Sequence, residues 1–150
     1  MPAIFVHGVP DTAHVWHSVT AGLDRPDVVT VALPGFGCAV PAGFAATKEA
    51  YVDWLLDVVA AAGQPVDLVG HDWGALLVVR AASLRPELVR TWAAGAAPID
   101  PEYEWHETAR MWQTPGQGEA VMELMTPDAM TAGLANVGVP ADDAAQAALF

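Results

Sequence analysis

An aspartate stands at the centre of a pentapeptide with glycine at both ends, Gly70-His71-Asp72-Trp73-Gly74. It follows a short apolar run and precedes a longer helical pattern. A side chain that projects from so tight a strand-to-helix turn needs small residues two positions on either side, because larger ones would keep strand and helix apart. The positive end of the following helix also favours an anion there. The pattern predicts that Asp72 is a carboxylate nucleophile; a simple turn capped by aspartate is the structural alternative.

A second motif, His7-Gly8-Val9-Pro10, directly follows the first apolar run of the chain. Together the two motifs resemble the α/β-hydrolase superfamily, and within it the branch of epoxide hydrolases and haloalkane dehalogenases, in which aspartate replaces serine as nucleophile. The resemblance covers most of residues 3–97 and weakens after them.

Two further segments have the pattern of this family. They are Ala32-Leu33-Pro34-Gly35-Phe36-Gly37, which is similar to an Asp-x-Pro-Gly-x-Gly loop, and Arg85-Pro86-Glu87-Leu88-Val89. Ala32 stands where the family has its acid, so the ordering role of that acid has no counterpart here.

The resemblance implies a covalent mechanism. A carboxylate suits displacement at a saturated carbon, so Asp72 would open an epoxide or expel a halide and become an alkyl ester. Water then cleaves the ester, and the family places the backbone N–H groups of Val9 and Trp73 around the oxyanion that forms. It also implies a cis Val9–Pro10 peptide bond. We therefore expect a hydrolase for a small apolar electrophile, with no cofactor and no metal.

The substrate chemistry is not decided by the motifs alone. The resemblance implies substrate contacts by His7, Gly8, Pro10 and Trp73. A tryptophan after the nucleophile suits halide binding, but Val9 stands where dehalogenases have an asparagine. Epoxide opening uses tyrosines of a cap as acids, and Tyr103 is the only tyrosine in that part of the chain, although an ordinary surface tyrosine explains it equally well. Epoxide hydrolysis is the first expectation; haloalkane dehalogenation, and an esterase or lyase on the same scaffold, are the alternatives.

The hydrolytic histidine is missing from its expected place. In this fold an acid and then a histidine follow the nucleophile, the histidine far toward the C-terminus. The only histidine after Asp72 is His106, and the side chain of His71 is expected to point away from the site. His14 and His17, three residues apart, are expected to be solvated rather than metal ligands. The chain is therefore expected to form the ester without releasing it, and a non-catalytic fragment or binding module is the competing hypothesis.

Short β-branched runs alternate with helical patterns, which indicates parallel strands joined by crossover helices. Four strands are expected, over residues 3–6, 28–32, 66–69 and 90–94. The third is short, apolar and ends at Gly70, as expected for a buried central strand. We therefore expect an α/β fold, namely a three-layer α/β-hydrolase-type parallel sheet with four of the family's strands present.

Three helices are expected around these strands. The first is capped by Thr47 and ended by Gly63. Its apolar face comprises Tyr51, Leu55, Val58 and Ala62. The pattern over 75–84 is apolar nearly all round, which predicts a buried helix that ends ahead of Pro86. A shorter helix, about 14–23, is expected to bury Trp16, Val19 and Leu23.

The composition changes after Pro98, where strand patterns stop and tryptophans and methionines stand among proline and glycine breaks. The expected organisation is a core over 1–97 and an incomplete helical cap, or lid, over 98–150. Pro140 and the acids after it begin a last helix that runs to Phe150 without a cap, so the chain looks cut short. This predicts either self-association or completion by a missing C-terminal half.

The overall composition excludes several other classes of protein. Of the 150 residues 53% are hydrophobic, which suits one globular domain with a core. The formal net charge of −12 argues against nucleic acid or an anionic membrane as partner. No membrane-spanning run or signal peptide is recognisable, and the single cysteine, Cys38, fits a reducing compartment. We expect a cytoplasmic protein.

Overall fold

A computed structural model describes residues 1–148 of the chain. Four strands form one parallel sheet in the order β2-β1-β3-β4. They are β1 (Ala3–Val6), β2 (Val28–Val31), β3 (Val66–His71) and β4 (Val89–Gly95). The expected parallel α/β sheet is confirmed, and the strand bounds differ from those expected by two residues at most. The largest difference is in β3, which continues through Gly70 and His71 to the edge of the Asp72 turn.

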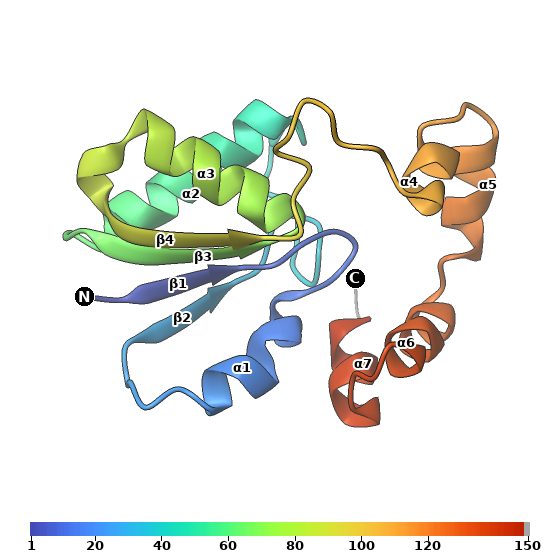
Figure 1. The fold of residues 1–150 in the computed structure, drawn as a ribbon, viewed down its shortest axis with the longest axis horizontal. Coiled ribbons are helices and arrows are strands. Elements are labelled where there is room, and N and C mark those ends of the chain that lie inside the picture. The colour runs from blue at the N-terminus through green and yellow to red at the C-terminus, as the bar shows by residue number, and fades with distance from the viewer. Residues whose placement is uncertain (149–150) are drawn as a thin grey trace.

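The helices lie in layers on the two faces of the sheet. Figure 1 shows α2 (Lys48–Ala61) and α3 (Trp73–Leu84) over one face and the short α1 (His17–Ala21) over the other. Thr47 caps α2 as expected, since its side chain accepts a hydrogen bond from the backbone N–H of Ala50 at 3.2 Å. Gly63, just beyond the end of α2, has a φ of +65°, which allows the chain to leave the helix.

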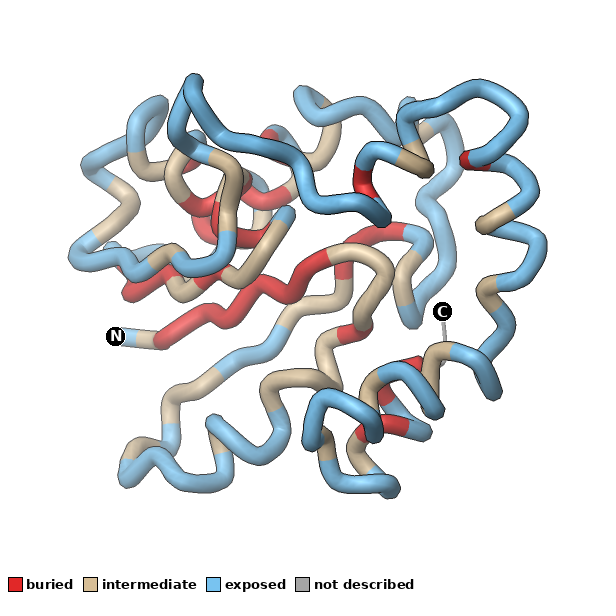
Figure 2. Tube along the Cα trace, turned by 45° about the vertical axis from the view of Figure 1, so that its right-hand side comes forward, coloured by how far each residue is buried: buried red, intermediate tan, exposed pale blue. Residues whose placement is uncertain are grey.

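The core lies between the sheet and the α2/α3 layer. Strand β1 is buried along its whole length, as expected where neighbouring strands cover both sides and helices cover both faces. The largest fully buried apolar side chains are those of Leu33, Leu55, Leu68, Val6, Val59, Val66 and Val78. Figure 2 shows that the buried residues gather in this region, whereas the C-terminal helices are mostly exposed.

The buried faces of α2 and α3 are narrower than the sequence predicts. In α2 the buried residues are Val52, Leu55 and Val59, so of the expected apolar face only Leu55 is fully buried and the other three positions are half-buried. In α3 the buried residues are Gly74, Ala75, Leu77, Val78 and Ala81. The expectation of a helix buried all round is wrong, because α3 covers the sheet with one face only and leaves Leu84 exposed.

The helix expected over 14–23 is also different. A 3₁₀-helix, η1 (Ala13–Trp16), precedes α1, and neither buries a residue fully. Val19 and Leu23 are 49% and 39% exposed, so the prediction that they are buried is wrong. Trp16 alone packs inward, with its ring edge-on to Phe5 at a centroid distance of 5.1 Å.

An aspartate within the apolar third strand is buried rather than solvated. Asp67 accepts hydrogen bonds from Arg90 and, at 2.6 Å, from the hydroxyl of Thr91. Arg25 donates to the same carboxylate at 3.2 Å. These donors, Arg90 first, lower the pKa of Asp67 to about 2. The carboxylate thus joins the loop before β2 to the last strand at the end of the sheet away from Asp72.

A short 3₁₀-helix, η2 (Pro86–Leu88), precedes β4. The elements that follow β4 in the described residues are the helices α4 (Glu107–Trp112), α5 (Gln117–Leu124), α6 (Pro127–Asn136) and α7 (Ala141–Ala147). The strand arrows in Figure 1 point toward these last four helices, so they lie beyond the carboxyl ends of the strands. The boundary expected near 97 stays a prediction. The end of the helix expected to reach Phe150 lies outside the described residues, and within 1–148 no helix has the length and apolar character needed to cross a bilayer.

The last helix packs back onto the N-terminal part of the chain. His14 Nε2 lies 3.1 Å from a carboxylate oxygen of Asp143, and Ser18 donates its hydroxyl to the other oxygen at 2.7 Å. The ring of His17 stacks on that of His14 at 5.0 Å. The expectation that both histidines are solvated is therefore wrong for His14, which is half-buried against α7. No cluster of three metal-ligating side chains occurs within residues 1–148.

Candidate active site

The register of the sheet brings the two predicted motifs to the same level. In the β1–β3 pair Val6 lies opposite Gly70, so the chain leaves both strands at one edge of the sheet. The His7-Gly8-Val9-Pro10 segment follows β1 there, and Asp72 follows β3. Because the carboxyl ends of parallel strands meet at a common edge, the two motifs are neighbours although 63 residues separate Val9 from Asp72.

Asp72 itself has a strained backbone. Its φ is +52° and its ψ is −122°, a conformation that few residues other than glycine adopt. The surrounding hydrogen bonds hold it there: its N–H donates to Gly95 and its carbonyl accepts from Ala75, both at 3.0 Å. Such strain is common where a structure must present one reactive side chain. The turn between β3 and α3 thus has the backbone expected of the predicted nucleophile.

The flanking glycines have the steric role that the sequence predicts. A Cβ atom on Gly70 would overlap the backbone of Gly74, and one on Gly74 would overlap the carbonyl groups of Val6 and His7. Both overlaps are with backbone atoms, which cannot move aside without shifting a strand or a helix. The close approach of α3 to the sheet therefore requires glycine at both positions.

The Asp72 carboxylate is held by the first motif. The backbone N–H of Val9 donates to its Oδ2 at 2.9 Å. A Cβ on Gly8 would collide with the Asp72 side chain, so glycine at position 8 permits this contact. The Val9–Pro10 peptide bond is cis. Trp73 is the first residue of α3, where backbone N–H groups have no partner inside the helix.

The structure places His7 inside the protein and outside the lining of the cavity over Asp72, which does not support the predicted substrate contact. Its side chain is completely buried, and both ring nitrogens are engaged: Nε2 accepts from the N–H of Leu33 at 2.9 Å, and Nδ1 donates to the carbonyl of Gly8 at 2.7 Å. The Leu33 bond requires an unprotonated Nε2, so the imidazole is neutral. Burial lowers the pKa of His7 accordingly. Through the bond to Leu33, the His7 side chain connects the loop at Leu33–Pro34 to the end of β1.

A cavity of about 460 Å³ opens over Asp72. Its lining comes from the Val9 loop, the Asp72 turn, the segment after β4 and the residues before α4. The lining residues are Val9, Asp11, His71, Asp72, Trp73, Ala96, Ala97, Pro98, Tyr103, Trp105 and His106. Among the predicted site residues, Val9, Asp72, Trp73 and Tyr103 therefore meet in one cavity, whereas Gly8 lies beneath the Asp72 side chain and Pro10 is outside the lining.

The aromatic wall of the cavity comes from the predicted cap. Tyr103 and Trp105 pack edge to face with ring centroids 5.3 Å apart. Both rings are partly exposed, as expected for side chains at the mouth of a cavity. Trp73, the first residue of α3, also lines the cavity and is 43% exposed. The cavity over Asp72 thus has three aromatic residues in its lining.

Three titratable residues of the cavity were not assigned to it from the sequence. Asp11 follows the first motif directly, and burial raises its pKa, with the neighbouring Asp72 raising it further and His71 lowering it. His71 is among the residues that line the cavity, and its ring lies edge-on to Trp16 at 6.3 Å. His106 also lines the cavity, while its Nδ1 accepts from the N–H of Ala109 at 3.2 Å and so caps α4. For Asp11 and His71 the available signal was adjacency to the motifs.

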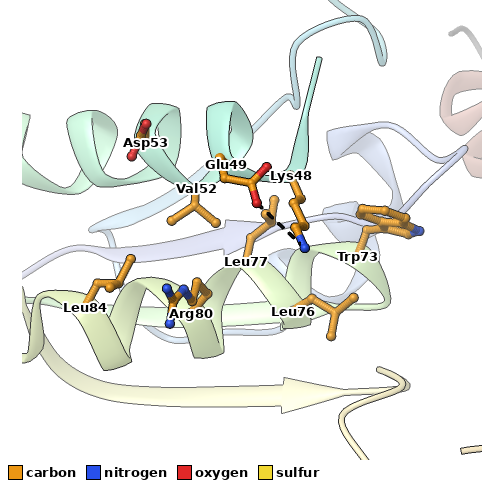
Figure 3. A pocket seen from close by; sticks show the side chains of 9 residues that line it. All are labelled: Lys48, Glu49, Val52, Asp53, Trp73, Leu76, Leu77, Arg80 and Leu84. Carbon is orange, nitrogen blue, oxygen red and sulfur yellow. Dashed lines mark ion pairs between the residues drawn. The ribbon is translucent and has the colours of Figure 1, made fainter. Parts of the chain in front are cut away.

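A larger cavity, about 620 Å³, lies between α2 and α3. Figure 3 shows its lining residues, which are Lys48, Glu49, Val52, Asp53, Trp73, Leu76, Leu77, Arg80 and Leu84. Lys48 and Glu49 pair across 3.7 Å. The predicted motifs around Asp72 line the smaller cavity and not this one, apart from Trp73. Trp73 is shared by both.

Comparison with known proteins identifies the family. A family model described as "Alpha/beta hydrolase family" matches residues 3–149. The (E)-2-((N-methylformamido)methylene)succinate hydrolase of Acinetobacter baylyi is 28% identical over 94 residues, which are 61% of this chain and 36% of that hydrolase. The chain therefore spans little more than a third of the length of this relative.

Solved structures of hydrolases have a similar fold. The haloalkane dehalogenase DbeA from Bradyrhizobium elkani superimposes with a TM-score of 0.68 at 28% identity, over 81% of this chain and 45% of that one. An E-2-(acetamidomethylene)succinate hydrolase superimposes with a TM-score of 0.74 at 24% identity, over 98% of this chain and 55% of that one. The second likeness is one of fold alone. Both proteins are about twice as long as the part of them that this chain matches.

Proposed function

Since this chain belongs to the alpha/beta hydrolase family, we propose that it acts through Asp72 as a nucleophile on small apolar electrophiles. The observation that supports the proposal most directly is the contact between the Asp72 carboxylate and the N–H of Val9 at 2.9 Å, from a turn with a φ of +52°. A carboxylate that served only as a helix cap would bond to its own helix, but Asp72 makes no side-chain bond to α3.

The reaction begins with attack on a saturated carbon. Because Oδ2 is held by Val9, Oδ1 is the oxygen that attacks. The carbon–leaving-group bond breaks, and the product is an alkyl ester of Asp72. Attack of water on the ester carbonyl then places negative charge on Oδ2, where the N–H groups of Val9 and Trp73 act as donors. This second step requires a base that takes a proton from the water.

An epoxide is the first candidate substrate. The cavity of about 460 Å³ suits a small ligand, and its aromatic wall suits an apolar one. Tyr103 serves as a substrate contact in this proposal. An epoxide also needs a proton for the oxygen that leaves carbon, and the cavity contains hydroxyl, carboxyl and imidazole groups.

Haloalkane dehalogenation is the second candidate. Indole N–H groups bind halides, and the indoles of Trp73 and Trp105 line the cavity. The likeness to the dehalogenase DbeA at 28% identity also favours it. Both candidates require the same alkyl ester on Asp72, so one experiment tests them together.

Intact-mass spectrometry after incubation with styrene oxide tests the proposal. We expect a mass increase of one epoxide per chain, located by peptide mapping at Asp72, and its loss in Asp72→Asn. Asp57→Asn, which removes an exposed carboxylate of α2, is the matched control and retains the adduct. Absence of any adduct on folded protein, with both styrene oxide and an alkyl bromide, would falsify the nucleophile. That result would leave the non-catalytic binding module as the better description.

A further inference from the structure

Asp11 is a second carboxyl group in the same cavity as Asp72. It is half-buried, and none of the hydrogen bonds within residues 1–148 involves its carboxyl oxygens, so only burial and neighbouring charges act on it. The carboxylate of Asp72, in contrast, accepts a hydrogen bond from the backbone N–H of Val9 at 2.9 Å. The cavity therefore contains two carboxyl groups in different surroundings: Asp72 accepts a hydrogen bond from a backbone N–H, and Asp11 is half-buried without one.

We propose that Asp11 is the general acid that protonates the leaving oxygen of an epoxide as Asp72 opens the ring. The inference rests on the proposed function and deepens it, since it assigns the substrate class. A halide leaves as a stable anion and needs no proton, whereas an alkoxide does. A proton donor beside the nucleophile therefore has a use only if the leaving atom is oxygen.

The step balances in atoms and charge. Oδ1 of Asp72 donates an electron pair to an epoxide carbon, and the bond from that carbon to the ring oxygen breaks. The electron pair of that bond goes to the ring oxygen, which takes the proton of the Asp11 carboxyl. The products are a hydroxyalkyl ester of Asp72 and an Asp11 carboxylate. The cavity begins and ends the step with one negative charge.

The other titratable groups of the cavity suit this role less well. Tyr103 is at the mouth, 39% exposed, and a phenol is a weaker acid than a carboxyl by roughly six powers of ten. His106 comes from the cap segment and uses Nδ1 to cap α4. His71, at the end of β3, packs edge-on against Trp16 and acts electrostatically on Asp11. Its charge lowers the pKa of Asp11, but burial, the larger effect, raises it.

Two alkylating probes separate proton donation from simple positioning. Styrene oxide needs a proton in the ring-opening step, and 2-phenylethyl bromide, of similar size, does not. In Asp11→Asn we expect the rate of Asp72 ester formation with the epoxide to fall about a hundredfold, while the rate with the bromide stays within about twofold. Asp57→Asn is expected to leave both rates unchanged, and Asp11→Glu to restore part of the epoxide rate.

The pH dependence gives a second readout. The wild-type epoxide rate should fall as pH rises through the raised pKa of Asp11, because only the protonated acid donates. The bromide rate should show no such fall, and neither should the epoxide rate of Asp11→Asn. The other groups that face this cavity, His71, Asp72, Tyr103 and His106, are present in both proteins.

Three results would overturn the assignment. Equal slowing of both probes in Asp11→Asn would mean that Asp11 only supports the shape of the site. Loss of the epoxide rate in Tyr103→Phe but not in Asp11→Asn would transfer the acid role to Tyr103. Failure of wild type to form an ester with either probe would remove the nucleophile itself, and with it the need for an acid. The bromide result therefore distinguishes failure of this inference from failure of the proposed function.

Discussion

At the level of single residues, the position of the Asp72 carboxylate depends on a neighbour without a side chain. A Cβ at position 8 would overlap the Asp72 side chain, so Gly8→Ala must displace the carboxylate from the N–H of Val9. A hydrogen bond to a charged group is worth about 1.5–3 kcal/mol, and we expect ester formation with styrene oxide to slow about tenfold or more. Intact-mass time courses measure the rate.

The matched control for this substitution is Gly133→Ala. Gly133 lies inside α6, and a Cβ there would have no neighbour within 4 Å. Alanine in a helix is favoured over glycine by about 1 kcal/mol, so this variant should be slightly more stable and equally reactive. Equal reactivity of Gly8→Ala and wild type would contradict the steric account.

A second residue-level prediction concerns the buried carboxylate of β3. Asp67→Asn removes the charge that Arg90, Thr91 and Arg25 surround, and we expect the free energy of unfolding to fall by about 2 kcal/mol near neutral pH. Urea unfolding followed by fluorescence measures it.

The pH dependence of this loss has a definite sign. The folded-state pKa of Asp67 is about 2, against an ordinary value of 3.8. A lowered pKa stabilises the fold above the ordinary value, and this contribution disappears as pH falls through the folded value. The difference between wild type and Asp67→Asn should therefore be constant above about pH 5 and shrink from about pH 4 to pH 2. A difference that grows on acidification would contradict the assignment.

The sequence predicts some of these residues and not others for a physical reason. Asp72 is recognisable because a strained turn between a strand and a helix needs glycines at fixed spacing. The role of His7 is not predictable in this way, because the motif is identical whether the histidine faces a ligand or accepts a hydrogen bond from Leu33. Asp11 and Asp67 are missed because their state depends on burial and on partners distant in the sequence.

At the level of elements, the contact of α7 with the N-terminal helices depends on one carboxylate. The carboxylate of Asp143 accepts a hydrogen bond from the hydroxyl of Ser18 at 2.7 Å, and its other oxygen lies 3.1 Å from His14 Nε2. Asp143→Asn weakens both contacts, so we expect faster amide hydrogen exchange over 141–147 and unchanged exchange in α3. Asp142→Asn, an exposed neighbour in the same turn, is the control. Equal protection of α7 in both variants would show that apolar packing alone holds it.

The elements differ in how well their sequences predict them. Strands and the Thr47-capped helix are predicted within two residues, since each has a local signal in its apolar run or cap. The helix expected over 14–23 fails because its apolar residues Val19 and Leu23 meet no neighbouring layer. The spacing of apolar residues predicts which face of a helix is apolar. Whether another element packs against that face depends on the fold.

At the level of the whole molecule, the chain has a sheet whose last strand is open. Strand β4 pairs with β3 on one side only, and most of its residues are exposed. In parallel sheets both faces and edges are normally covered. The sequence predicts a sheet of few strands, and so an uncovered edge, but not which residues are exposed there.

We propose that a second copy of the chain covers this edge at high concentration. Trp92 on β4 is 54% exposed although its partner in register, Leu68, is completely buried. Trp92→Lys places a charge on the edge and should shift the monomer–dimer equilibrium toward monomer in sedimentation velocity. Val40→Lys, the same charge on an exposed loop side chain, should not. Because each copy has a net charge of −12, added salt should favour association. A monomer at every concentration and salt, or equal effects of the two lysines, would rule out the β4 edge as the contact.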